Sequence, residues 1–243
     1  FSHIHCWQLS GLPVLPFTGN TNPALGPEVY GSLFKHAKEI IRPGYHKVYL
    51  EKYNIEAELT STQRVGFHRY TFPKSAESHI LLDLSVELGP SDTQRGYIKK
   101  TNNKELVGFA VMAPTRRRPK PVEVFYVIQF DKPFDSFNGW KKGILQTKID
   151  SIAGERIGGF VTFATSNHES RKMKVAISYV SIDQARLNLT TELAHWDFDK
   201  VVLDSKNEWN QALKKIEIKG GTQSEQRRFY TDLFHSLQGR RIV

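Results

Sequence analysis

The sequence contains a single cysteine, Cys6, so an intramolecular disulfide cannot hold the fold together. No run approaches the roughly 18 consecutive apolar residues of a transmembrane helix, and we expect no membrane span. The sequence also lacks the patterns G-x-G-x-x-G, G-x-x-x-x-G-K-[ST], G-x-S-x-G and C-x-x-C. Dinucleotide-binding, phosphate-loop, serine-hydrolase and zinc-ribbon functions therefore have no support.

What is present indicates a folded protein with a basic surface. The 243 residues are 39% hydrophobic, with 15 Phe, 9 Tyr and 4 Trp, which is too apolar and aromatic for a disordered chain. Lys and Arg exceed Asp and Glu by 34 − 25 = 9. Four of these charges, Arg116, Arg117, Arg118 and Lys120, lie in the proline-bracketed run TRRRPKP. Prolines disfavour a helix there, so we predict a solvated loop and no nucleic-acid partner, with a phosphate-binding patch as the alternative.

The middle of the chain has the pattern of antiparallel strands. Apolar and polar residues alternate in short segments separated by Gly, Pro, Asn and Asp, without intervening helices of crossover length. Consecutive strands must then pair antiparallel, which predicts a mainly β fold, an antiparallel β-sandwich. The eight expected strands are 46–51, 54–60, 64–72, 78–85, 105–113, 122–130, 157–165 and 172–181.

The pattern changes to a helical one near the C-terminus. Ser205 with Glu208, and Thr222 with Glu225, have the spacing of a capping box, which predicts two helices that begin at these residues. The second helix carries a wide apolar stripe that needs a partner surface, formed by Phe229, Tyr230, Leu233, Phe234 and Leu237. We therefore divide the chain into a sandwich over residues 1–200 and a helical linker over residues 201–243.

Candidate binding residues gather at the N-terminus. His3 and His5 would share one face of a strand, which fits either two metal ligands or polar groups lining a pocket; no third ligand stands at a diagnostic spacing. Trp7 beside Gln8 offers an apolar plate next to a directional amide, as a sugar requires, although a core tryptophan explains it equally well.

No pair of carboxylates stands out as a catalytic acid and base. Asp197 and Asp199 are interpreted as groups at a helix N-terminus, where acidic residues cap the helix or favour its dipole. Glu56, Glu58 and Asp83 alternate with core residues, and we expect them on a solvated strand face. Asn188-Leu189-Thr190 fits a glycosylation sequon.

Four runs together resemble glycoside hydrolase family 92, the calcium-dependent exo-acting α-mannosidases. They are FSHIHCWQLSG at 1–11, PGYHKVYLEKYNIEAELTSTQRVGFHRYTFP at 43–73, ISYVSIDQARLNLTTELAHWDFDKV at 177–201 and GGTQSEQRRFYTDLFHSLQGRRIV at 220–243. The resemblance implies an N-terminal sandwich followed by a helical (α/α)6 domain, with the active site where the two meet. It also implies that this chain, which begins at Phe1 rather than Met, is a fragment.

In the family, the catalytic Glu acid and Asp base belong to the helical domain, so the resemblance implies no catalytic residue in this chain. It implies that His3, His5, Trp7 and Gln8 contribute to substrate binding. Ser2, His3 and His5 match the family's motif near the domain interface, and Trp7 and Gln8 lie in the stretch that shapes the rim of the sugar pocket. Calcium is the implied cofactor, with ligands mainly in the absent domain and none assigned here. The run Arg64, His68, Arg69 and Tyr70 is expected to be structural or interface-forming, while His46 departs from the aromatic residue that the family more often has.

The sequence thus predicts the N-terminal part of a glycosidase that removes terminal mannose from glycans, including N-glycans, with inversion and α-1,2 preference. Its expected partners are mannose-containing glycans and the (α/α)6 domain. Glycan substrates favour an exported location: periplasmic, cell-surface or secreted. We expect the isolated chain to be inactive. The alternative is a free-standing carbohydrate-binding or structural sandwich.

Overall fold

A computed structural model describes residues 1, 11–86, 92–116 and 118–238 of the chain, and in this part it has two antiparallel sheets. The smaller, five-stranded sheet has the order β1-β6-β13-β10-β11. Its strands are β1 (Val14–Thr18), β6 (Ser75–Asp83), β13 (Ile157–Thr165), β10 (Ser136–Lys141) and β11 (Ile144–Gln146).

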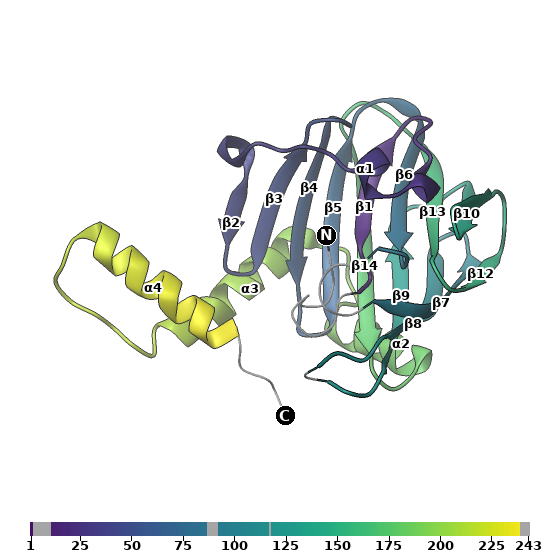
Figure 1. Cartoon of the computed structure of the whole chain (residues 1–243). Coiled ribbons are helices and arrows are strands. Elements are labelled where there is room, and N and C mark those ends of the chain that lie inside the picture. Colours follow the sequence, from purple (N-terminus) through teal and green to yellow (C-terminus); the bar gives the residue numbers. More distant parts are fainter. Residues whose placement is uncertain (2–10, 87–91, 117, 239–243) are drawn as a thin grey trace.

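The larger, nine-stranded sheet has the order β12-β7-β8-β9-β14-β5-β4-β3-β2 and extends past the smaller sheet on the β2 side (Figure 1). Its strands are β12 (Ser151–Gly154), β7 (Thr93–Asn102), β8 (Glu105–Met112), β9 (Val122–Phe130), β14 (Glu169–Ser178), β5 (Val65–Phe72), β4 (Ile55–Ser61), β3 (Tyr45–Leu50) and β2 (Ile40–Arg42). Two short 3₁₀ turns, Pro23–Leu25 and His36–Lys38, and the one-turn helix α1 (Pro27–Tyr30) lie between β1 and β2.

The large sheet buries both of its faces, and strand β5 shows how the sequence achieves this. Tyr70 and Phe72 point inward and join the core between the two sheets. Val65 and Phe67, an odd number of residues away, point outward into a second apolar cluster. Because successive side chains alternate between faces, apolar residues at both odd and even positions of one strand indicate that both of its faces are covered. We call these the inner and outer faces.

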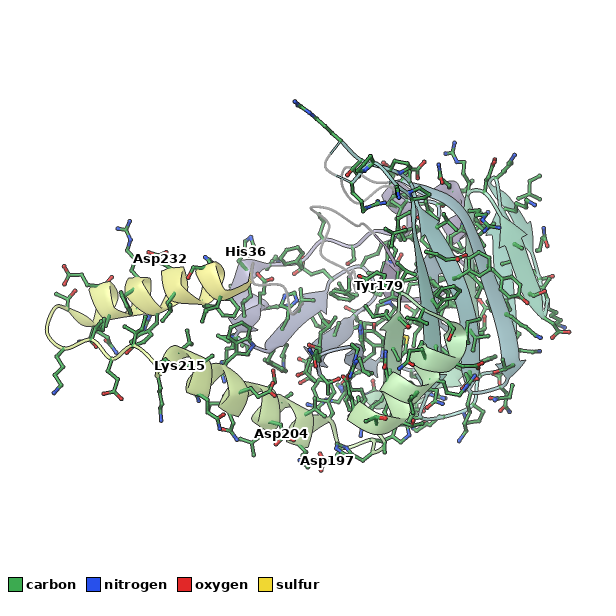
Figure 2. The ribbon with its side chains drawn as sticks, turned by 90° about the horizontal axis from the view of Figure 1, so that it is seen from below. His36, Tyr179, Asp197, Asp204, Lys215 and Asp232 are labelled. Atoms are coloured by element: carbon green, nitrogen blue, oxygen red, sulfur yellow. The ribbon has the colours of Figure 1, made fainter. Side chains whose placement is uncertain are left out.

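Helices α2 (Ile182–Glu192) and α3 (Phe198–Leu213) cover the outer face (Figure 2). Ala185 and Leu189 of α2 and Phe198 and Val201 of α3 complete the second apolar cluster. Helix α3 continues beyond the sheet edge, and α4 (Gln223–Gln238) folds back along it. Phe234 of α4 packs on Trp209 of α3 with ring centroids 4.6 Å apart. Part of the apolar stripe of α4 is therefore covered by α3.

The eight expected strands are confirmed, with shifts at their ends. Six further strands of the structure were not predicted from the sequence. Of these, β7 carries Arg95, Lys99 and Lys100 and so lacks apolar alternation, and β1 contains Pro16, which only an edge strand tolerates. The remaining four, β2, β10, β11 and β12, are three to six residues long.

The helix boundaries differ from the sequence prediction at two points. Helix α2 was not expected, and α3 begins at Phe198 rather than near Ser205. Asp197 accepts a hydrogen bond from the amide of Lys200 and caps α3, which confirms its interpretation as a helix-terminal residue. Ser205 instead lies buried within α3, so the proposed capping box with Glu208 is wrong.

The second capping box, of Thr222 and Glu225, is confirmed. The amide of Thr222 donates to the Glu225 carboxylate, and the amide of Glu225 donates to the Thr222 hydroxyl. The solvated strand face expected for the strand carboxylates is wrong for two of them. Glu58 is buried beneath α3, and Asp83 is buried where it accepts a hydrogen bond from Tyr30.

Candidate functional site

The residues that the sequence singled out for sugar binding, His3, His5, Trp7 and Gln8, lie outside the described residues, as does Ser2. The two ends of their segment are described. Phe1 and Val14 exchange backbone hydrogen bonds of 2.8 and 3.0 Å. The described residues on the two sides of the segment therefore lie next to each other. The ring of Phe1 meets the imidazoles of His46 and His68 edge to face, with centroids 6.4 and 6.3 Å apart. This segment therefore starts beside two histidines of the large sheet.

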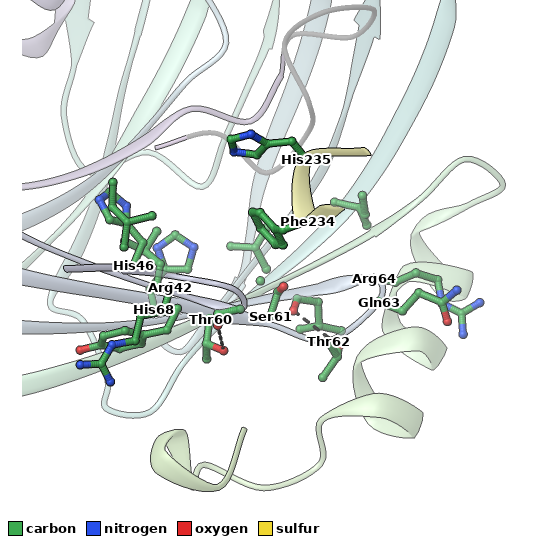
Figure 3. Close-up of a pocket in the computed structure, with 18 residues that line it drawn as sticks. Arg42, His46, Thr60, Ser61, Thr62, Gln63, Arg64, His68, Phe234 and His235 are labelled. Atoms are coloured by element: carbon green, nitrogen blue, oxygen red, sulfur yellow. Dashed lines mark hydrogen bonds between the residues drawn. The ribbon is translucent and has the colours of Figure 1, made fainter. Parts of the chain in front are cut away.

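Those histidines line a cavity of about 530 Å³ at the part of the large sheet that extends past the small one (Figure 3). Residues from β2, β3, β14, the β4–β5 turn and the last turns of α4 contribute to its wall. Its polar side chains are Arg42, Tyr45, His46, Thr60, Ser61, Thr62, Gln63, Arg64, His68 and His235. Ile41, Leu59, Val175, Ile177 and Phe234 provide apolar surface between them.

The histidines reach the cavity because of strand alternation. His46 is two residues from Val48, and His68 is two residues from Tyr70, so both imidazoles point to the inner face. Both residues were noted in the sequence, but no pattern along the chain indicated that they lie next to each other. The alternation of each strand indicates that the imidazole is on the same face as the core residues. Only the pairing of β3, β4 and β5 brings the two imidazoles to one surface.

Hydrogen bonds hold both imidazoles in place. His46 Nε2 lies 2.8 Å from Glu39 Oε1, and His36 Nδ1 lies 2.7 Å from the other oxygen of Glu39. The hydrogen bonds from His36 and His46 lower the pKa of Glu39, so this carboxylate is ionised at neutral pH. His68 Nδ1 lies 2.6 Å from the hydroxyl of Tyr70, whose pKa is raised by burial, so that the hydroxyl keeps its proton.

The cavity offers hydrogen-bonding side chains next to apolar surface, and no described residue of its wall is Asp or Glu. Such a surface can bind and orient a ligand with many hydroxyl groups. Hydrolysis of a glycosidic bond requires two carboxyl groups on either side of the bond. The wall as described can therefore serve binding, and a carboxylate pair would have to come from elsewhere in the protein.

The outer face beside this cavity holds an ion-pair network that connects α3 to the sheet. Arg69 donates to both oxygens of Glu58 at 2.7 and 2.8 Å and to Asp199, in the first turn of α3, at 3.0 Å. Its guanidinium also lies over the ring of Phe198, 4.4 Å from the centroid. Burial would raise the pKa of Glu58, but the hydrogen bonds from Arg69 and Tyr45 outweigh it and hold this pKa below its usual value.

The expected run Arg64, His68, Arg69 and Tyr70 thus divides between the two faces. Arg64 pairs with Glu192 at the end of α2, and Arg69 pairs with α3, so the two arginines hold helices. His68 and Tyr70 face inward, where His68 lines the cavity. Both arginines thus have the structural role that was expected. Arg64 also lines the cavity, as His68 does, and so belongs to the candidate binding surface as well.

Two other predictions from the sequence have clear structural counterparts. In the run TRRRPKP, Arg116 and Lys120 are exposed, and Arg118 donates to backbone carbonyls of Ala113 and Lys120. The described residues of the run therefore form a solvated loop. Asn188 of the sequon is buried in α2, where it donates to the carbonyl of Ile177 and accepts from Gln184. In the folded chain this asparagine is not accessible to a glycosylating enzyme.

No helix among the described residues is long and apolar enough to cross a membrane. In the same part of the chain, no group of three or more His, Cys, Asp or Glu side chains is arranged to hold a metal ion. No calcium ligand is assigned among the described residues, and the calcium requirement stays a prediction.

Two family models match the chain consecutively. The glycosyl hydrolase family 92 N-terminal domain matches residues 1–178, and the family 92 catalytic domain matches residues 184–243. The chain belongs to glycosyl hydrolase family 92. The second match begins at α2, so in this family the helices that cover the outer face of the sandwich are counted with the catalytic domain.

Relatives in family 92 are considerably longer than this chain. A protein of Arthroderma benhamiae, described as an uncharacterized secreted glycosidase, is 27% identical in an alignment 227 residues long; the match covers 81% of this chain and 28% of that protein. The fold resembles that of the family 92 α-mannosidase BT3965 from Bacteroides thetaiotaomicron, with a TM-score of 0.83, 23% identity, and coverage of 94% of this chain and 32% of that one. The inverting family 92 mannosidase BT2199 of the same organism matches with a TM-score of 0.78 and 20% identity, over 92% and 29% of the two chains.

Proposed function

We propose that this chain is the N-terminal part of a glycosidase that hydrolyses terminal α-linked mannose of glycans, with α-1,2 preference and inversion of the anomeric carbon. The observation that carries the proposal is the pair of family 92 matches, which together cover nearly the whole chain in the order of the family. The family 92 proteins with a similar fold include one described as an α-mannosidase and one described as an inverting mannosidase, which supports the substrate and the stereochemistry.

In this proposal the sandwich contributes one wall of the sugar site. Phe1, which directly precedes the segment with His3, His5, Trp7 and Gln8, lies beside His46 and His68. This supports the proposal that the segment and the cavity form one binding surface. Hydroxyl groups of the sugar would pair with imidazole and amide groups, while Trp7 and Phe234 supply apolar contact.

The catalytic acid and base are proposed to come from the part of the catalytic domain that this chain does not span. The described wall of the cavity lacks carboxylates, which is consistent with a site in which the sandwich binds the sugar and the catalytic domain supplies the acid and base. In an inverting reaction the acid protonates the leaving oxygen while the base activates water on the opposite face of the ring. Calcium, when bound, supplies oxygen coordination of sugar hydroxyls; we derive no step through it, because no calcium ligand is assigned among the described residues.

The test compares three proteins: the 243-residue chain, a chain extended through the catalytic domain, and the extended chain with Trp7→Ala. Each is assayed with α-1,2-mannobiose in the presence and absence of calcium, and NMR follows the anomer released. We expect the extended chain to release β-mannose first, in a calcium-dependent reaction, and the 243-residue chain to be inactive, because acid–base catalysis contributes about 10² to 10⁴-fold.

Two results would contradict the proposal as a whole, and two others would contradict one part of it. Turnover by the 243-residue chain would show that its own residues supply the acid and base. An extended chain that folds but hydrolyses no α-mannoside would remove the mannosidase function. Full activity of the Trp7→Ala variant would remove Trp7 alone from the site. Release of α-mannose would replace inversion by retention.

We also propose that the protein is exported. The secreted description of the Arthroderma benhamiae relative and the location of glycan substrates outside the cytoplasm support this. Fractionation of the source cells, with an antibody against this chain, tests it. Recovery of the protein exclusively from the cytosol would contradict the proposal.

A further inference from the structure

A second cleft, of about 280 Å³, lies on the outer face of the large sheet, whereas the cavity described above lies on the inner face. The β7–β8 turn, the end of β9 and the connection between α2 and α3 surround it. It is lined by Asn102, Lys104, Glu105, Gln129, Phe130, Asp131 and Trp196. Lys104 Nζ donates to the carbonyl of Asp131. The other side chains combine aromatic rings with planar polar groups, and neither the family matches nor the proposed function assigns a role to them.

Glu105 fixes the orientation of the Gln129 amide. The Glu105 carboxylate accepts hydrogen bonds from Arg186, from Thr101 and, at 3.0 Å, from Gln129 Nε2. Because an ionised carboxylate only accepts, the nitrogen of the Gln129 amide must face Glu105. The amide oxygen Oε1 then points away and has no hydrogen-bond partner in the described part of the chain. It is an oriented acceptor.

In two neighbouring side chains, one polar atom is hydrogen-bonded and the other is available to a ligand. Asn102 Oδ1 accepts from the amide of Lys104 at 2.8 Å, which leaves the two N–H groups of Nδ2 as donors. Asp131 Oδ1 accepts from the amide of Lys172 at 3.0 Å, which leaves Oδ2 as an acceptor. For neither remaining atom do the described residues provide a partner. In each case a turn or strand amide holds one end of the side chain and orients the other.

Trp196 is held as rigidly as the polar groups. Its carbonyl accepts from Lys172 Nζ at 2.8 Å, its ring meets the edge of Phe67 at 5.9 Å, and Lys174 Nζ lies 4.0 Å from the ring centroid. One face of the ring is therefore occupied by an ammonium group. Trp196 is only partly buried and lines the cleft, so part of its ring is left for a ligand to contact. The indole N–H of this partly buried residue finds no acceptor within the described ranges.

We infer that this cleft is a second carbohydrate-binding site, which takes a single neutral pyranose unit of a glycan. A pyranose has an apolar C–H face, which suits the ring of Trp196, and hydroxyl groups that both donate and accept, which suit Gln129 Oε1, Asp131 Oδ2 and Asn102 Nδ2. The volume is below that of a site for a drug-sized molecule, so it fits one sugar ring rather than an oligosaccharide. The site would hold a branch of a glycan on the face opposite the cavity, and it does not depend on the proposed hydrolysis.

The test follows the indole N–H signals of the ¹⁵N-labelled chain while methyl α-D-mannopyranoside or methyl β-D-glucopyranoside is added. The signal of Trp196 is assigned by its loss in Trp196→Phe, a variant that keeps an aromatic ring. We expect this signal to shift with a dissociation constant in the millimolar range for at least one sugar. Gln129→Leu and Asp131→Asn should weaken binding at least tenfold, because each removes an oriented acceptor, while Gln94→Leu, on an exposed position of β7, should leave it unchanged.

Retained dispersion of the amide signals shows that each variant is folded, so that a loss of binding reports the cleft. The inference is wrong if neither sugar moves the Trp196 signal. It is equally wrong if binding moves only another indole signal, or if Gln129→Leu and Asp131→Asn bind as well as the unchanged chain. None of these results bears on the mannosidase assay, which requires the extended chain.

Discussion

At the scale of single residues, Arg69 connects three elements through one side chain. It lies on β5, pairs with Glu58 on β4, and reaches Asp199 and Phe198 at the start of α3. The sequence marked Arg69 as a structural or interface residue because it belongs to a motif of the family. Only the strand pairing and the position of α3 show that its partner is a buried carboxylate.

Replacement of Arg69 by methionine should lower the free energy of unfolding by roughly 2–3 kcal/mol, because Glu58 would stay buried without its partner. This is less than the cost for a fully buried pair, since the Arg69 side chain retains 22% exposure. Urea unfolding followed by circular dichroism measures the difference. The matched control is Lys200→Ala, which breaks an exposed pair with Asp204 and should change stability little. Equal effects of the two variants would contradict this role of Arg69.

His79 is a buried histidine of the small sheet that stays neutral. Its ring stacks on Phe17 at 4.4 Å, and Nδ1 lies 3.0 Å from the hydroxyl of Thr162. Burial lowers its pKa to about 4, against a smaller opposing effect of a hydrogen bond with the backbone of Gly19. Between about pH 6.5 and 4 the unfolded chain therefore binds a proton that the folded chain does not, and His79 makes stability fall as the pH falls through this window.

We expect the imidazole signals of His79 to titrate near pH 4 in NMR spectra of the folded chain. In His79→Gln, which keeps a group able to bond Thr162, the decrease of unfolding free energy from pH 6.5 to 4.5 should be smaller than in the unchanged chain. Titration of His79 at the ordinary histidine pKa would show that the ring is solvated.

At the scale of elements, the turn between β2 and β3 shows how a helix is fitted to the sheet. Gly44 has φ = +77°, and a Cβ there would lie 2.0 Å from Ser205 Oγ and 3.4 Å from the ring of Trp209 in α3. The turn needs glycine both for its backbone conformation and for the approach of the helix. Buried Ser205, read from the sequence as a cap, is instead the residue that this turn contacts.

Gly44→Ala should therefore destabilise the chain more than Gly19→Ala. Gly19 has nearly the same φ, +78°, with nothing within 4 Å of a Cβ, so its substitution costs only the backbone strain of about 1–2 kcal/mol. At Gly44 we expect about 1–3 kcal/mol in addition, from overpacking against Ser205. The double variant Gly44→Ala/Ser205→Gly should recover part of that excess in thermal or urea unfolding. Equal costs at the two glycines would mean that α3 moves away freely.

At the scale of the whole molecule, three partly buried carboxylates join the large sheet to its helices. Glu58 is held by Arg69, which also pairs with α3, Glu105 of β8 pairs with Arg186 of α2, and Glu192 of α2 pairs with Arg64 before β5. In each case burial would raise the pKa of the carboxyl group. The hydrogen bonds that the carboxylate accepts from the arginine and from hydroxyl or amide donors outweigh this effect and lower the pKa. The stability from these pairs is present above the unfolded pKa and is lost as the pH falls through the lower, folded values.

We accordingly expect a steep loss of stability below about pH 4.5. The loss caused by His79 begins at higher pH. Urea unfolding at intervals from pH 7 to 3 measures it, and Glu105→Gln should show a smaller loss between pH 4.5 and 3. Glu77→Gln, at an exposed position of β6, is the control and should follow the unchanged chain. Identical curves for Glu105→Gln and the unchanged chain would remove this pair from the connection between sheet and helix.

The sequence by itself determined the fold class, the eight regular strands and the family, because these depend on local alternation, turn residues and motifs that can be read along the chain. It also indicated the N-terminal cap at Asp197 and the capping box of Thr222 and Glu225, whose partners are within a few residues. Its candidate sugar-binding residues at 3, 5, 7 and 8 stay predictions.

The tertiary structure decided everything that depends on contacts between distant segments. It brought His46 and His68 to one cavity, buried Glu58 beneath α3, placed the Asn188 sequon in a packed helix, and assembled the cleft at Trp196 from three segments. Strand order and helix placement fix these neighbours, and both depend on how apolar faces are buried together. That burial is a property of the whole chain, so no local pattern could have specified which side chains would meet.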